Sequence, residues 1–291
     1  MRVLQLNIWA RYGPYPDRER HLKRLFAELR PDLISLIEVD AGTDGSESQA
    51  HELLDGLGYE VAFERRGDDE GGAPGIAVAS RHPILGREVK QLGRQGVALG
   101  ARIGLEQEQE QMWFAAVTTM SWTPGLEAER EPKVVELDRW LCELAADDAI
   151  PPVMGGDFDA TPDTSSIRFL TGLQSLDGRS TFWADAFAQA GDGTPGYTWT
   201  SDSPFVQPFM EAVFGQPVHH RRIDYVFVGS PIRWKPRLIV TSARVVGQYA
   251  DGGAPSDHYG ILAELELDGD RVGRGRGLEG WDDAKHELGW R

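Results

Sequence analysis

Residues 256–265 read SDHYGILAEL, so that an acid and an imidazole stand side by side directly before an alternating apolar run. The alternation predicts a half-buried β-strand that begins just after His258. At the mouth of such a strand, Asp257 can act as a metal ligand or an orienting carboxylate, and His258 as a proton-transfer group. One such pair carries little weight alone, and its meaning depends on polar residues elsewhere in the chain.

Four other short polar signatures occur upstream, each at the end of a hydrophobic, strand-like run. They are LNIW at residues 6–9, LIEV at 36–39, GGDFDA at 155–160 and RIDYV at 222–226. In this order, and with SDH at 256–258, they resemble the endonuclease/exonuclease/phosphatase superfamily, which includes pancreatic deoxyribonuclease, AP endonucleases, neutral sphingomyelinases and inositol polyphosphate phosphatases. The resemblance runs from about Met1 to Leu267. It implies an α/β fold, namely a four-layer α/β/β/α sandwich of two mixed β-sheets flanked by helices, and a metal-dependent phosphodiesterase or phosphatase.

The positions of the polar residues along the predicted strands independently indicate mixed sheets. Asn7, Glu38 and Asp157 follow their strands, whereas Asp224 and His258 precede theirs. If the later strands run antiparallel to the earlier ones, all of these side chains meet at one rim. The predicted strands are residues 3–8, 33–37, 75–80, 112–118, 223–228, 237–246 and 259–267, and the predicted helices are 17–29 and 130–146.

The signatures come from both ends of the chain, which favours one domain over residues 1–267. A Gly/Arg/Asp-rich tail follows over 268–291, and we expect it to be surface-docked or partly disordered. Three segments, 40–49, 67–74 and 194–217, are predicted to be loops because turn-forming residues are frequent in them. Loops at the rim of a sheet commonly form the wall of a substrate site.

The charge balance limits the class of partner. The chain of 291 residues carries 46 acids against 30 Lys and Arg, a formal net charge of −16, and it has no Lys/Arg-rich run. A duplex-binding protein needs a basic face for the phosphates, so duplex nucleic acid is disfavoured and a nuclease is the weaker interpretation. Arg65-Arg66 and residues 219–222 could still bind a small anion. We therefore expect a small-molecule or lipid-like phosphate ester as the substrate.

Cysteine content and hydropathy indicate the compartment. Cys142 is the only cysteine, which rules out an intrachain disulfide and a cysteine-rich zinc site. No apolar run is long enough to span a membrane, and the N-terminal residues already form the first predicted strand rather than a signal peptide. We expect a cytoplasmic protein, and the sequence leaves its oligomeric state open.

The resemblance implies a divalent cation, Mg²⁺ or Mn²⁺, held by Glu38 with help from Asn7 and Asp257. A carboxylate at the tip of a buried apolar run is costly unless it has a partner such as Mg²⁺. Oxygen donors of this kind also suit hard divalent cations. Taken alone, however, Glu38 could be a helix cap or a surface acid, and Asn7 an ordinary polar residue at a strand end.

The catalytic roles are likewise implied by the resemblance. The family residue that matches Asp157 orients or activates the attacking water, and the pair that matches Asp224 and His258 stabilises the phosphoryl charge or moves a proton. At position 159 the family usually has an asparagine that donates to the phosphate. An ionised Asp159 cannot donate and repels phosphate, so it must ligate a metal, be protonated by its neighbours or serve a changed reaction.

Thr119 is a second departure, because family members usually have a histidine at this point. Its loss removes a cationic phosphate contact. We expect Thr119 to lie on the substrate side with Trp9 and Trp122, whose rings can form an apolar or stacking wall for a small molecule.

Two alternatives to a phosphoesterase stay open. A repurposed biosynthetic enzyme of the same fold, acting on a non-phosphate metabolite, would account for Asp159 and Thr119. A non-catalytic binding protein is disfavoured because the expected catalytic and metal-binding positions are intact, namely Glu38, Asp157, Asp224 and His258.

Overall fold

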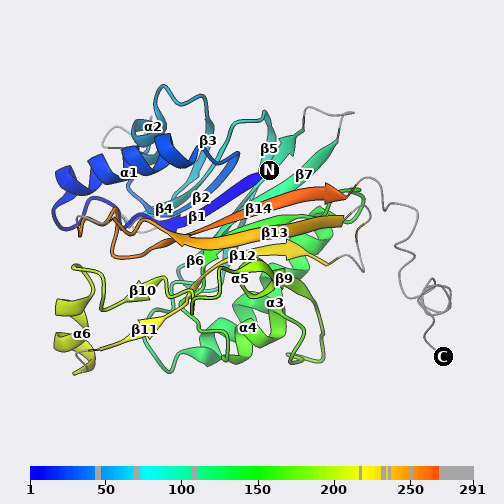
Figure 1. Cartoon of the computed structure of the whole chain (residues 1–291). Coiled ribbons are helices and arrows are strands. Elements are labelled where there is room, and N and C mark those ends of the chain that lie inside the picture. The colour runs from blue at the N-terminus through cyan, green and yellow to red at the C-terminus, as the bar shows by residue number, and fades with distance from the viewer. Residues whose placement is uncertain are drawn as a thin grey trace.

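Two six-stranded sheets and the helices outside them make up the protein (Figure 1). The computed structural model describes residues 1–42, 47–67, 73–105, 110–215, 218–230, 234, 237–249 and 252–268. The strands are β1 (Arg2–Asn7), β2 (Leu33–Val39), β3 (Glu60–Glu64), β4 (Gly75–Ser80), β5 (Ile84–Leu92), β6 (Gly96–Gly104), β7 (Gln111–Thr118), β8 (Val153–Asp157), β9 (Trp183–Asp185), β10 (Trp199–Thr200), β11 (His220–Arg221), β12 (Asp224–Gly229), β13 (Arg237–Val246) and β14 (Gly260–Asp268). The helices are α1 (Tyr15–Leu29), α2 (Gln49–Leu54), α3 (Glu127–Leu144), α4 (Ser165–Leu170), α5 (Ala186–Ala190) and α6 (Gln207–Phe214).

The layers follow the expected α/β/β/α order. One sheet has the strand order β13-β14-β1-β2-β4-β3 and the other β5-β6-β7-β8-β12-β9, while β10 and β11 form a separate ribbon. The main core lies between the two sheets. Apolar residues of α1 and α2 cover the outer face of the first sheet, and those of α3 and α4 cover the outer face of the second. The predicted four-layer fold with mixed sheets is therefore confirmed.

The alternation of β1 shows how the sequence builds these layers. Leu4 and Leu6 point outward and pack with apolar residues of α1. Val3 belongs to the core between the sheets. Gln5 and Asn7, which share the face of Val3 because side chains alternate along a strand, are fully or almost fully buried. The inner face of β1 is thus apolar at its start and polar toward its end, where the site residues lie.

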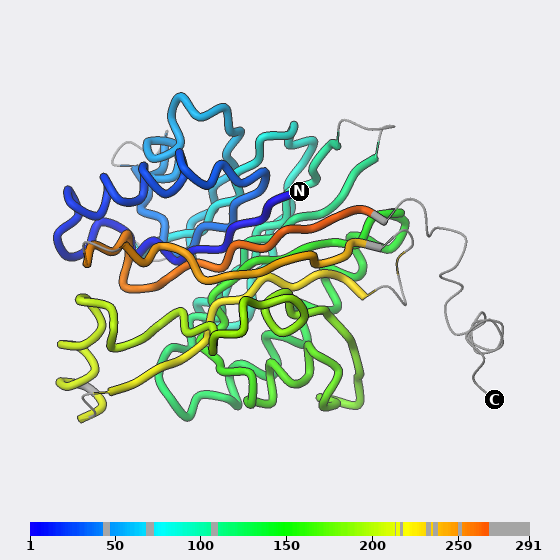
Figure 2. Tube along the Cα trace, viewed as in Figure 1, coloured from blue at the N-terminus to red at the C-terminus, as the bar shows by residue number. Residues whose placement is uncertain are grey.

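The strand directions bring the polar signatures to one rim, as the sequence predicted. β1 and β2 are parallel, β14 is antiparallel to β1, and β12 is antiparallel to β8. The trace in Figure 2 shows β14, close to the end of the described chain, beside β1 at its start. In the register of the second sheet, Asp224 lies directly opposite Asp157. The start of a late strand therefore meets the end of an early one.

Gly155 allows the two sheets to approach each other behind this rim. A Cβ atom at this position would lie 2.8 Å from the Cβ of Ser35 and 3.2 Å from that of Gln5, both on the facing sheet. We therefore expect Gly155→Ala to lower the free energy of unfolding by about 1–3 kcal/mol, the usual cost of overpacking a core. Urea denaturation measures this effect. Gly86→Ala is the matched control, because a Cβ there meets nothing within 4 Å; equal midpoints for the two variants would contradict the argument.

The predicted loop over residues 194–217 was wrong in part, because the structure places β10 and α6 within it. The prolines and glycines of this segment masked a helical spacing of apolar residues. Pro208 lies in the first turn of α6, where a missing N–H costs no hydrogen bond. Residues 43–46 and 68–72 of the other two predicted loops, and 269–291 of the predicted tail, lie outside the described residues. Within the described chain, no helix has the length and hydropathy to cross a membrane.

Candidate active site

The chain turns away sharply at the strand ends that carry the predicted site residues. The backbone angle φ is 53° at Trp9, 55° at Glu38, 48° at Met120 and 54° at Asp159. Residues other than glycine rarely adopt this left-handed region, which costs about 1–3 kcal/mol each unless surrounding contacts impose it. One such contact is the amide of Ala10, which donates to the Glu38 carbonyl at 2.8 Å. The strained rim is typical of a functional site.

Asn7 links two of the predicted acids. Its Nδ2 donates to Glu38 Oε1 and to Asp157 Oδ2, both at 3.0 Å. Its Oδ1 accepts the amide of Trp9 at 2.9 Å, and this bond fixes the orientation of the amide group. Asn7 therefore holds the Glu38 and Asp157 carboxylates at a set spacing across the two sheets.

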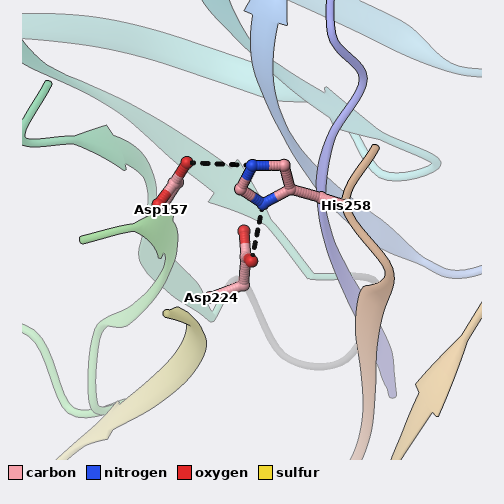
Figure 3. Close-up of side chains that lie close together, drawn as sticks. All are labelled: Asp157, Asp224 and His258. Carbon is pink, nitrogen blue, oxygen red and sulfur yellow. Dashed lines mark hydrogen bonds and ion pairs between the residues drawn. The ribbon is translucent and has the colours of Figure 1, made fainter. Parts of the chain in front are cut away.

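His258 lies between two carboxylates, as Figure 3 shows. Its Nδ1 is 2.9 Å from Asp224 Oδ2, and its Nε2 is 3.9 Å from Asp157 Oδ2. The second oxygen of Asp224 accepts Gln5 Nε2 at 3.0 Å. Because a protonated imidazole donates from both nitrogens, the ring can bind Asp224 while its other N–H is directed toward Asp157.

The surroundings shift the pKa values of this group. Burial alone would lower the pKa of His258, but the nearby carboxylates of Asp224, Asp257 and Asp157 outweigh it and raise that pKa well above its ordinary value. Burial raises the pKa of Asp157 well above the ordinary range, and repulsion from Asp159 and Asp224 adds to this effect. The site therefore combines a cationic donor with a carboxyl group of increased basicity, as general acid and base catalysis requires.

Glu38 and Asp257 form an acidic pair on the other side of Asn7. Burial raises the pKa of Glu38, and repulsion from Asp257 raises it further. Burial likewise raises the pKa of Asp257, although a hydrogen bond from Ser256 Oγ at 3.1 Å opposes this. Within the described part of the chain, no ion pair joins a lysine or arginine to either carboxylate. Two half-buried acids without such a partner fit a divalent cation.

Asp159 is held by the segment that precedes α3. Its Oδ2 accepts the Ser121 amide at 2.8 Å and the Thr119 hydroxyl at 3.3 Å. Lys133 Nζ in turn binds the Thr119 carbonyl at 2.7 Å and Ser121 Oγ at 2.8 Å. Thr119 is fully buried and does not line the cavity described below, so the structure places it against Asp159 rather than in the expected position beside the substrate.

A cavity of about 230 Å³ opens above these residues. One part of its wall is charged and the other is mainly aromatic. The charged side chains are Glu38, Asp157, Asp159, Arg221, Asp257 and His258, and the apolar ones are Trp9, Met120, Trp122, Trp199, Phe205, Val206, Phe209 and Ile223. Trp9 and Trp122 thus line the cavity, as the sequence predicted.

The aromatic wall contains rings that the sequence did not assign to the site. The ring of Phe205 lies 5.5 Å from that of Trp9, and the ring of Phe209 lies 6.0 Å from that of Trp122. The ring of Trp199 lies 6.4 Å from the His258 ring. Both phenylalanines belong to α6 or the turn before it, and their apolar spacing was the signal that could have revealed them.

Arg18 supports the rim from below. Its buried guanidinium donates to the carbonyls of Ile8, Trp9, Ala10, Tyr12 and Pro255 at 2.7–3.1 Å. It therefore connects the loop after β1 with the segment that carries Asp257 and His258. No sequence pattern indicates this role, because the acceptors are backbone atoms that packing alone brings together.

Comparison with known proteins agrees with this geometry. Residues 4–258 match the model of the Endonuclease/Exonuclease/phosphatase family. The chain belongs to this family. Members of this family generally use divalent metals for hydrolysis, and the buried cluster of Asp157, Asp224 and His258 is consistent with such chemistry.

Relatives within the family are distant. The chain is 28% identical to Protein angel of Drosophila melanogaster over 181 residues, which are 58% of this chain and 50% of that protein. It therefore spans about half the length of the curated relative it matches. The human Nocturnin catalytic domain with a bound sulfate anion is similar in structure, with a TM-score of 0.68, 21% identity, and 92% of this chain and 93% of that chain covered.

Two further structures show the same fold. An endonuclease/exonuclease/phosphatase from Bacteroides vulgatus has a TM-score of 0.68 at 18% identity, with 92% of this chain and 98% of that chain covered. D. rerio TDP2 complexed with single strand DNA product has a TM-score of 0.67 at 17% identity, with 92% and 99% covered. At these identities the likeness shows the fold alone.

Proposed function

We propose that the protein is a divalent-metal-dependent phosphoesterase that hydrolyses a small or lipid-like phosphate ester. The observation that carries this proposal is the His258 imidazole between Asp224 and Asp157 at the charged end of an aromatic cavity. A phosphate ester with an apolar alcohol fits both ends, because its phosphoryl group needs cationic donors and its alcohol needs apolar surface.

The roles of the residues follow from their contacts. Asp157, with its raised pKa, positions and deprotonates the attacking water. His258, held by Asp224, donates from Nε2 to the phosphoryl oxygen and stabilises the charge that develops there. Asn7 keeps Asp157 beside Glu38. Asp159 holds the segment before α3 through Ser121.

Glu38 and Asp257 would hold the cation, with Asn7 adjacent. When bound, Mg²⁺ or Mn²⁺ would neutralise these acids and supply Lewis-acid stabilisation of the phosphoryl charge. The cluster of Asp157, Asp224 and His258, whose ligand atoms lie within 4.8 Å of one another, is a less suitable cation site. Its Asp224 oxygens already accept hydrogen bonds from Gln5 and His258.

We expect Mg²⁺ to raise the thermal stability, and to do so more at pH 8 than at pH 5. Burial raises the pKa of Glu38, Asp157, Asp159 and Asp257, so the folded chain retains protons that the unfolded chain releases. Stability without cation therefore falls as the pH rises above the ordinary carboxylate range, and the raised pKa of His258 acts in the same direction. A cation binds the ionised carboxylates and restores about 2.7 kcal/mol at 100 times its Kd. Melting curves with Mg²⁺ and Mn²⁺ check this, and the absence of a shift at either pH would contradict a metal site.

The proposed function is tested by hydrolysis assays. Aryl phosphodiesters, aryl monoesters, phospholipid headgroup esters and plasmid DNA are offered with and without Mg²⁺ or Mn²⁺, and Asp157→Asn controls for contaminants. Metal-dependent turnover of a small or lipid-like ester is the expected result. Efficient nicking of plasmid at low enzyme concentration would overturn the preference for small substrates, and binding without turnover of any ester would indicate a non-catalytic protein.

A second candidate is the end of a single-stranded nucleic acid. The aromatic wall favours it, because nucleobases stack on such rings without sequence preference. The net charge of −16 weighs against it, since long strands need a basic groove. Short single-stranded oligonucleotides in the same assay separate the two candidates.

A further inference from the structure

Arg221 is the only lysine or arginine among the described residues that line the cavity. It ends β11, the strand of the separate ribbon that leads toward β12. Its Nη2 donates to the main-chain carbonyl of Asp159 at 2.7 Å. This bond anchors one edge of the guanidinium beside the charged end of the cavity.

The remaining donors of Arg221 have no hydrogen bond to the described protein. A guanidinium has five N–H groups in a fixed planar arrangement, and the single bond to Asp159 uses one edge of it. The next residue, Arg222, differs in this respect: it is buried, and its Nη1 binds the Asp185 carboxylate at 2.8 Å. Arg222 is therefore a structural ion pair, whereas Arg221 presents unused donors to the cavity.

The contacts of Asp159 explain why a positively charged side chain, that of Arg221, lies at the charged end of the cavity. Its carboxylate accepts from Ser121 and Thr119, so its side chain supplies no donor to the substrate. Its main-chain carbonyl instead holds Arg221. The asparagine and histidine that the family usually has at positions 159 and 119 are absent from this chain. Arg221 instead offers planar, permanently charged donors beside Asp159.

We propose that Arg221 binds the phosphoryl group of the substrate through the free edge of its guanidinium. This inference rests on the proposed function. It also narrows the substrate class: the ester must present two oxygens on one side, as a phosphodiester or monoester does, with its alcohol toward Trp199 and Phe209. Arg221 is thus a specificity-determining residue that replaces the missing cationic contact at position 119.

The test uses inorganic phosphate as a probe, which does not depend on turnover. Isothermal titration with the metal-loaded protein should show that Arg221→Gln raises the Kd for phosphate about 10- to 100-fold, as expected for loss of a charged hydrogen bond. Arg221→Lys should recover part of the phosphate affinity, because lysine keeps the positive charge but lacks the planar pair of donors of a guanidinium. Arg87→Gln is the matched control, because Arg87 also donates to a single backbone carbonyl, that of Phe63, and lies outside the cavity.

The double variant Asp159→Asn with Arg221→Gln tests whether Arg221 binds phosphate or only neutralises the charge of the Asp159 carboxylate. If Arg221 binds the phosphoryl group, Arg221→Gln should weaken phosphate binding by a similar factor in the Asp159→Asn background and in the native background. If Arg221 only balances the Asp159 charge, Arg221→Gln should have no effect on phosphate affinity in the Asp159→Asn background, and the inference is wrong. Unchanged affinity in Arg221→Gln would also overturn the inference.

The ester assay separates this inference from the proposed function. If the native protein hydrolyses an ester, Arg221→Gln should raise KM about 10-fold or more, whereas a purely structural role would lower the melting temperature and leave KM unchanged. If no ester is hydrolysed but phosphate affinity still depends on Arg221, the phosphate contact stands and the proposed function fails.

Discussion

His258→Gln is expected to lower kcat by about 10²–10⁴-fold, the usual contribution of a positioned proton-transfer group. The glutamine amide can still donate to Asp224, so the buried carboxylate keeps a partner and the protein should unfold cooperatively. The variant nevertheless lacks the charged donor that Nε2 provides beside Asp157. The measurement is kcat for the ester that the native protein hydrolyses best, with circular dichroism to confirm the fold.

The control is His82→Gln at the opposite end of the strands, where His82 lies beside Met1 in a separate surface cavity. The kcat of His82→Gln should match that of the native protein.

The pH profile of kcat gives a second test of the role of His258. Because the carboxylates raise the pKa of His258, protonated His258 sets a limb on the alkaline side of the pH profile, whereas the raised pKa of Asp157 sets a separate acid limb. Asp224→Asn should move the alkaline limb to lower pH. Native turnover in His258→Gln would exclude the assigned role.

Arg18→Met is expected to lower the free energy of unfolding by about 3–4 kcal/mol, because it leaves several buried carbonyl oxygens without a donor, at about 1–3 kcal/mol each and less than additively. The methionine fills part of the volume but cannot bind the carbonyls of Ile8, Ala10 or Pro255. Since these carbonyls border Trp9 and the segment before His258, kcat should fall together with stability.

Arg20→Met is the matched control on the same helix. Arg20 forms an ion pair with Asp17, and its side chain is 77% exposed. Exposed pairs of this kind contribute about 0–1 kcal/mol, so the variant should unfold close to the native midpoint. Denaturant titrations of both variants make the comparison, and equal midpoints would show that Arg18 does not support the rim.

Local pattern was enough to predict most of the strands that build the site. β1, β2, β4, β12, β13 and β14 begin and end within two residues of the predicted bounds. In each of them, apolar alternation or a buried apolar run is visible in a short window. β5 and β6 were not predicted, although they form a long antiparallel pair. β5 is largely exposed, so it lacks the apolar pattern on which the prediction depended.

By itself, the sequence determined which polar residues stand at strand ends. It predicted that they would converge on one rim if the later strands run antiparallel to the earlier ones; these residues are Asn7, Glu38, Asp157, Asp224 and His258. The positions of these residues along the predicted strands were enough for that prediction, and the structure supplied the strand directions. Only the tertiary structure decided what each group touches: that Asp159 turns to Ser121, that Thr119 lies behind it, and that Arg221 faces the cavity. The physical reason is that these contacts join residues far apart in the chain, often through backbone atoms, and depend on how sheets and loops pack rather than on the identity of neighbouring residues.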